Sequence, residues 1–180
     1  MHCWKTINVK KQYGFNRIFT FALLTGLGVF TAFYVLLNIV YSGPLSDKYF
    51  LTFLMGVAAV YPLHKICHFM PLIGSRKCIK FIKKQHFIFP GFSLHVKEPV
   101  AKNRFTLALA LPFLLINSII ILLTALFPAY IHYFALLLAY HCSLCLPDLI
   151  YMRHLARSPK YALIEETDTG FEILVPQVIA

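Results

Sequence analysis

Two histidines, His64 and His68, stand four residues apart in the apolar stretch YPLHKICHFMPLIG. On a helix this spacing places both rings on one face, where they can bind one metal ion. In the zinc-peptidase motif His-Glu-x-x-His, the residue after the first histidine is the glutamate that acts as general base. Here that position holds Lys65, which accepts a proton only when it is neutral and which brings a positive charge close to a dication. The stretch is therefore a metal site, a site without its usual base, or a pair of hydrogen-bonded core histidines.

A second polar pattern lies closer to the C-terminus. His141, Cys145 and Asp148 are spaced i, i+4 and i+7, which also places them on one helical face. Ionisable groups are costly inside a bilayer, so we expect this face and the His64 face to lie against each other. Two alternatives need no metal: a structural ion pair between Lys65 and Asp148, or a Lys65 side chain that reaches the headgroups.

The composition indicates whether these residues lie in a soluble or a membrane protein. Of 180 residues, 59% are hydrophobic and 13% are charged, against about 25% charged in a typical soluble domain. The five cysteines are an odd number, and most lie in apolar surroundings, unlike the disulfide framework of a secreted protein. We expect a single membrane domain over residues 1–180. Its four predicted spans are 18–41, 49–73, 105–126 and 130–152.

Lysine and arginine predict the orientation of these spans. They concentrate in the N-terminal segment, in the loop 74–104 and in the tail 153–180, and they are nearly absent from the other two loops. Because cytoplasmic loops carry the excess of these residues, both termini should be cytoplasmic. The net charge of +10 then faces anionic lipid headgroups, which favours the lipid bilayer over nucleic acid as the partner.

Short strands are predicted on the same side. The stretch HFIFPGFSLHVKEPVAKNRF is rich in strand-forming residues, with Pro90-Gly91 as its turn, and residues 161–175 suggest a hairpin around an Asp-Thr-Gly turn. A lone hairpin is marginal in water, so the tail should pack on the central loop or on the helices. The predicted fold is a mostly α, polytopic membrane protein with four transmembrane helices and a small cytoplasmic β element.

Several stretches together resemble one family of small bacterial membrane proteins, domain-of-unknown-function family 3267, described as zincin peptidases. They are MHCWKTIN, LHKICH, KEPVAKNRF, HCSLCLPDLIYMRHLARSPK and ALIEETDTGFEIL, and the resemblance covers nearly the whole chain. Such proteins are similar in plan to site-2 proteases, with His-Glu-x-x-His on one membrane helix and an aspartate on a later one. The resemblance implies a multi-pass protein of the bacterial cell membrane.

By this resemblance His64, His68 and Asp148 match the three ligands of a zinc ion, with His141 or Cys145 as a spare ligand or a supporting group. Lys65 departs from the pattern at the catalytic position. We expect a non-proteolytic or weakly active relative of the metalloproteases that holds a membrane-protein partner or a substrate helix. The alternatives are an active metallopeptidase with a displaced base, for which Asp148 and His141 are candidates, and a metal-free membrane scaffold.

Overall fold

Four long helices dominate this computed structural model, which describes residues 1–73, 79–85, 90–96, 99–167 and 170–175. The four are α2 (Phe15–Val40), α3 (Phe50–Phe69), α4 (Lys102–Leu126) and α5 (Ile131–Ala156). Each is by length and composition apolar enough to cross a membrane, which confirms the predicted four helices of spanning length. Two short helices, α1 (Val9–Tyr13) and the 3₁₀ turn η2 (Pro128–Tyr130), precede α2 and α5.

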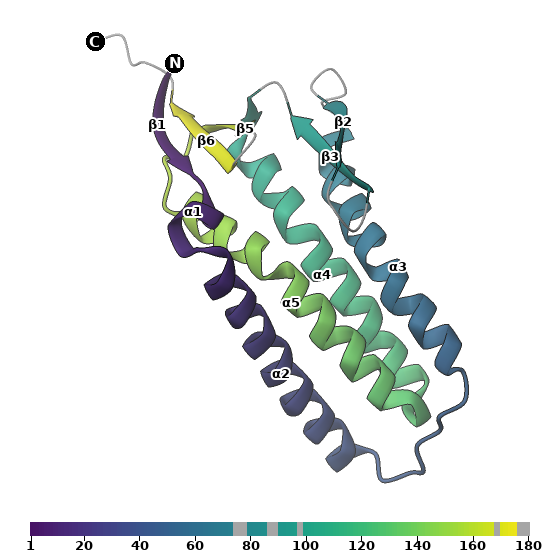
Figure 1. The fold of residues 1–180 in the computed structure, drawn as a ribbon. Helices are drawn as coiled ribbons and strands as arrows, with labels where there is room; N and C mark the ends of the chain where they lie inside the picture. The colour runs from purple at the N-terminus through teal and green to yellow at the C-terminus, as the bar shows by residue number, and fades with distance from the viewer. Residues whose placement is uncertain (74–78, 86–89, 97–98, 168–169, 176–180) are drawn as a thin grey trace.

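The helices stand in the order α2, α5, α4, α3 across the bundle (Figure 1). The N-terminal strand and the C-terminal hairpin lie at one end of this bundle, and the loops that join α2 to α3 and α4 to α5 lie at the other. An even number of spans requires this arrangement of the chain ends. Which end faces the cytoplasm stays a prediction from the lysine and arginine distribution.

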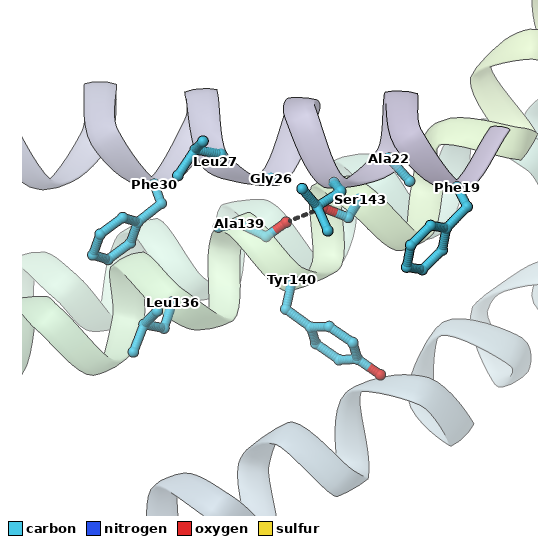
Figure 2. Close-up of a pocket in the computed structure, with 10 residues that line it drawn as sticks. Phe19, Ala22, Gly26, Leu27, Phe30, Leu136, Ala139, Tyr140 and Ser143 are labelled. Atoms are coloured by element: carbon cyan, nitrogen blue, oxygen red, sulfur yellow. Dashed lines mark hydrogen bonds between the residues drawn. The ribbon is translucent and has the colours of Figure 1, made fainter. Parts of the chain in front are cut away.

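Small residues bring α2 close to α5. A Cβ at Gly26 would clash with the hydroxyl of Ser143 and meet the carbonyl of Ala139, so the two backbones approach where side chains are smallest. Ser143 Oγ donates a hydrogen bond to Ala139 O at 2.9 Å, which satisfies the hydroxyl within its own helix. Figure 2 shows this contact among the residues that line an open, mostly apolar pocket of about 490 Å³ between the two helices.

The terminal strands form a four-stranded antiparallel sheet. Its order is β1 (His2–Ile7), β6 (Gly170–Val175), β5 (Leu163–Thr167) and β4 (Val100–Ala101). The predicted tail hairpin is therefore present, and it pairs with the end of the central loop through β4. The pairing of β6 with β1 was not predicted, because the N-terminal segment was interpreted only as a basic flank.

The central loop forms its own hairpin, from β2 (Ile79–Gln85) and β3 (Pro90–Val96). The prediction of a turn at Pro90-Gly91 is wrong: Pro90 pairs with Gln85 and Gly91 with Lys84, so both lie in β3. Proline has no N–H to donate, but it is tolerated as the first residue of a strand. The connection between the two strands, 86–89, lies outside the described residues.

A buried core attaches the four-stranded sheet to the helix ends. Ile164 and Ile173 on the sheet are fully buried, and each such side chain stabilises the fold by roughly 1.5–3 kcal/mol. They belong to one cluster with Ile7, Val9, Leu72, Val100, Phe105, Ala108, Leu109, Leu155 and Ala162. Because this cluster includes residues of α4 and α5, the sheet packs against the ends of both helices.

Candidate metal centre

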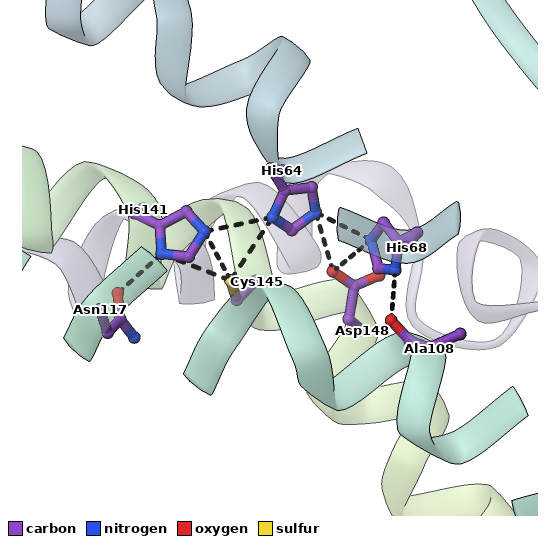
Figure 3. A network of polar contacts seen from close by, with 7 residues as sticks. All are labelled: His64, His68, Ala108, Asn117, His141, Cys145 and Asp148. Atoms are coloured by element: carbon purple, nitrogen blue, oxygen red, sulfur yellow. Dashed lines mark hydrogen bonds and ion pairs between the residues drawn. The ribbon is translucent and has the colours of Figure 1, made fainter. Parts of the chain in front are cut away.

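Three side chains from two helices converge on one point inside the bundle. His64 and His68 come from α3 and Asp148 from α5, and Figure 3 shows their polar atoms directed toward one another. The Nε2 atoms of the two histidines lie 3.0 Å apart. Asp148 Oδ2 lies 3.2 Å from His64 Nε2 and 3.5 Å from His68 Nε2. The structure thus brings together the three residues that the sequence predicted as ligands.

A backbone carbonyl on α4 fixes the protonation of His68. Its Nδ1 lies 2.8 Å from Ala108 O. A carbonyl oxygen only accepts hydrogen bonds, so Nδ1 carries the proton and donates it. In the neutral ring, Nε2 then presents a lone pair toward His64 and Asp148.

A chain of three side chains fixes His64 in the same way. Asn117 donates from Nδ2 to Cys142 Sγ at 3.6 Å, which leaves its Oδ1 facing His141 Nδ1 at 2.7 Å. His141 Nδ1 therefore donates, and its Nε2 accepts from His64 Nδ1 at 3.2 Å. The Nε2 of a neutral His64 is left with a lone pair that also faces the point of convergence.

Two lone pairs and a carboxylate oxygen this close repel one another unless a positive charge lies among them. Asp148 Oδ2 is buried and makes no hydrogen bond of ordinary geometry with any residue that the structure describes, although both histidine nitrogens are within ion-pairing distance. A single proton joins two of the three atoms at a time, whereas a metal ion contacts all three. The convergence therefore suits a metal better than a proton.

The spacing of these atoms fits zinc. In a tetrahedral site, bonds of about 2.0–2.2 Å to nitrogen and oxygen separate neighbouring ligand atoms by roughly 3.3–3.6 Å. The observed separations of 3.0, 3.2 and 3.5 Å are close to one face of such a tetrahedron. Three protein ligands and an open fourth position are typical of catalytic zinc sites. His64 is buried, but His68 and Asp148 keep 18% and 17% of their side-chain surface exposed, so the site is not sealed.

A second group of donor atoms shares His64. Cys145 Sγ lies 3.8 Å from His64 Nδ1 and 3.4 Å from His141 Nε2, and all three residues are buried. These atoms too are close enough to hold a metal ion. However, the hydrogen bond between His64 Nδ1 and His141 Nε2 already occupies the two nitrogens that this group would need. His141 therefore orients His64 of the first group through this hydrogen bond, and Cys145 lies beside the two rings.

Lys65 does not take part in this convergence. Its side chain is exposed, and its Nζ lies 5.9 Å from the centroid of the Tyr61 ring, one turn earlier on α3. The proposed ion pair between Lys65 and Asp148 is wrong, since the carboxylate faces the two histidines instead. Lys65 lies about 100° around the helix from His64, so it need not be a ligand, and its ammonium group is directed to Tyr61 and not to the three converging atoms.

Comparison with known families agrees with this geometry. The family model of domain of unknown function 3267, with the description "Putative zincin peptidase", matches residues 57–163, more than half of the chain. The chain belongs to this zincin family. The matched stretch contains both histidines, Lys65 and Asp148, so the lysine stands at the motif position of a chain that belongs to the family. Comparison with curated proteins and with solved structures found no match.

Two groups on α4 were missed by the sequence analysis of this zincin-family chain. Neither the side chain of Asn117 nor the carbonyl of Ala108 was predicted to belong to the site. Pro112 could have indicated the second, because a proline in a helix leaves the carbonyl four residues earlier without its backbone donor. That carbonyl belongs to Ala108.

Proposed function

We propose that this chain is a zinc-binding membrane member of the zincin family in which the usual hydrolytic base has been lost. The observation that carries the proposal is the convergence of His64 Nε2, His68 Nε2 and Asp148 Oδ2 within 3.5 Å of one another. The hydrogen bonds of the two rings leave lone pairs on the converging nitrogens. This is the protonation state in which histidine binds a metal.

The residues divide the work of such a site. His64, His68 and Asp148 would hold the ion, while Ala108 O and His141 orient the two rings from behind. When bound, zinc supplies a Lewis acid that can polarise a carbonyl group or activate a water for hydrolysis. A general base contributes typically about 10²–10⁴-fold to such a reaction. Lys65, exposed beside Tyr61, is in no position to supply it.

A general base at another position would restore hydrolysis. The two candidates, His141 and Asp148, already have other partners. Both ring nitrogens of His141 are within hydrogen-bonding distance of a partner, Asn117 on one side and His64 on the other. Asp148 directs Oδ2 into the centre, where it would serve as a ligand. We therefore favour a protein that uses a metal-stabilised fold to hold a membrane-protein partner or substrate helix over an active peptidase.

Zinc content tests the proposal. The full chain, purified in mild detergent without chelators, should retain about one zinc per chain, measured by mass spectrometry of the metal against protein concentration. His68→Ala and Asp148→Ala should each lose it. His132→Ala is the matched control, since His132 lies near Asp47 at the other end of α5. A wild-type protein without metal after zinc has been added back would refute the proposal and favour the metal-free scaffold.

A peptide-hydrolysis assay distinguishes an inactive family member from an active metallopeptidase. A quenched fluorescent transmembrane peptide should be cleaved no faster by the zinc-loaded wild type than by His68→Ala. Lys65→Glu restores the residue type of the peptidase motif and should keep the zinc. Cleavage by the wild type that requires both His68 and zinc would show that a displaced base exists and would overturn the loss of activity proposed here.

A further inference from the structure

We propose that α4, which contributes no metal ligand, sets the metal affinity of the centre by holding both histidines in the tautomer that binds metal. Pro112 and Asn117 are the positioning residues. This inference rests on the proposed zinc site, but it concerns residues that no ligand role accounts for. It predicts that changes on α4 alter zinc binding without touching a ligand.

Pro112 acts through the backbone. In a regular helix the N–H of residue 112 would donate to the carbonyl of residue 108, but proline has no N–H. The carbonyl of Ala108 is thereby left free to accept from His68 Nδ1, at 2.8 Å. Both Pro112 and Ala108 are buried, so water is not a ready substitute partner for this carbonyl. The proline thus creates the acceptor that orients His68.

Asn117 acts through His141. It is 8% exposed, and its amide has donor and acceptor roles assigned by its two neighbours: Nδ2 faces Cys142 Sγ and Oδ1 faces His141 Nδ1. Were the acceptor lost, His141 could take the other tautomer and donate from Nε2 to His64 Nδ1. His64 would then carry its proton on Nε2, where a metal ligand needs a lone pair.

The Ala108 carbonyl and the Asn117 side chain both lie on α4. The carbonyl of Ala108 accepts directly from His68 Nδ1, whereas Asn117 acts on His64 Nδ1 through the ring of His141 (Figure 3). Such partners orient the ring and raise its basicity, and their removal typically weakens metal affinity about 10- to 100-fold. A purely structural role for Pro112 and Asn117 would change the stability of the bundle and leave the affinity for zinc unchanged.

The test is the zinc dissociation constant of the detergent-purified full chain, measured by competition with a chromophoric chelator. Asn117→Leu should weaken binding by about 10- to 100-fold. Asn117→Asp, which keeps an acceptor oxygen toward His141, should restore most of the affinity. Pro112→Ala returns an N–H to the helix, which competes with His68 for the Ala108 carbonyl, and it should weaken binding by at least about 10-fold.

Thr124→Val is the matched control on α4. Thr124 is buried and bonds only to Ile120 O of its own helix among the contacts that the structure shows, so its removal should leave the dissociation constant unchanged. Circular dichroism and gel filtration check that each variant is folded. Cobalt substitution adds a readout, because Asn117→Leu should alter the visible spectrum of the tetrahedral ion.

The outcomes distinguish this inference from the proposed function. If Asn117→Leu and Pro112→Ala bind zinc as tightly as the wild type while His64→Ala does not bind it, the site stands and the role of α4 is refuted. If Asn117→Asp binds as weakly as Asn117→Leu, the acceptor role of the amide is refuted. If the wild type itself binds no zinc, both proposals fail.

Discussion

The ammonium group of Lys65 lies 5.9 Å from the centroid of the Tyr61 ring, on the exposed side of α3. A cation over an aromatic face is attracted by the ring quadrupole. This contact holds the lysine side chain at Tyr61 without any contact to the metal centre. The motif position after the first histidine therefore carries a cation in place of a carboxylate. His64 and His68 still face inward, so under the proposed function the substitution removes the base and keeps the two metal-binding rings.

Replacing Lys65 with alanine should leave zinc binding unaffected. The side chain makes no hydrogen bond or ion pair with any described residue of the centre, and its removal leaves the three converging atoms in place. Metal content after purification should equal that of the wild type. A loss of zinc from Lys65→Ala would show that the lysine supports the centre and would contradict its placement beside Tyr61.

Ile173→Ala should destabilise the attachment of the sheet to the helices. Ile173 is fully buried in the core that joins the sheet to α4 and α5, and truncation of such a residue costs about 2–5 kcal/mol. Thermal unfolding in detergent should show a clearly lower midpoint. Tyr161→Ala is the control, because that side chain is 85% exposed and should change stability by less than about 0.5 kcal/mol. Equal midpoints for the two variants would argue against the packed core.

Gly26→Leu should push α2 away from α5. Any side chain at Gly26 meets Ser143 and Ala139, whereas a Cβ at Gly28 meets nothing within 4 Å. We expect Gly26→Leu to lower the unfolding midpoint and Gly28→Leu to leave it unchanged. Zinc content should survive in both, because α2 supplies none of the residues that converge at the centre. Loss of zinc in the Gly26 variant would mean that α2 supports the site.

The orientation of the bundle is tested by reporter fusions. Alkaline phosphatase is active only outside the cytoplasm, so a fusion at Gly43 should be active and one at Gly91 inactive. The reason is the concentration of lysine and arginine on the side of the chain ends. Reporters that give the same signal at both positions would contradict the four-span arrangement, and exchanged signals would reverse the orientation.

The sequence predicted the parts of this fold that depend on long, regular patterns. The four spans followed from uninterrupted apolar runs, and the tail hairpin from alternation around Gly170. The pairing of β1 with β6 could not be predicted, because β1 is largely exposed and rich in polar residues. Strand pairing between opposite ends of a chain leaves no local signal.

The same distinction holds at the centre. The i, i+4 spacing predicted that His64 and His68 share a face, and the family resemblance implied Asp148 as the third ligand. The supporting groups were missed because their role depends on how α4 is rotated against α3, which spacing along the chain does not fix. Asn117 resembles any polar residue of a membrane helix until His141 is found 2.7 Å away.

X-ray absorption at the zinc edge tests the central claim most directly, because it reports which atoms surround the metal. The zinc-loaded full chain should show only nitrogen and oxygen neighbours at about 2.0–2.2 Å, with the outer-shell scattering of two imidazole rings. Asp148→Ala should remove the zinc, and Cys145→Ser should leave the spectrum unchanged. A sulfur neighbour at about 2.3 Å would place the metal on Cys145 with His64 and His141 and would contradict the site assigned to His64, His68 and Asp148.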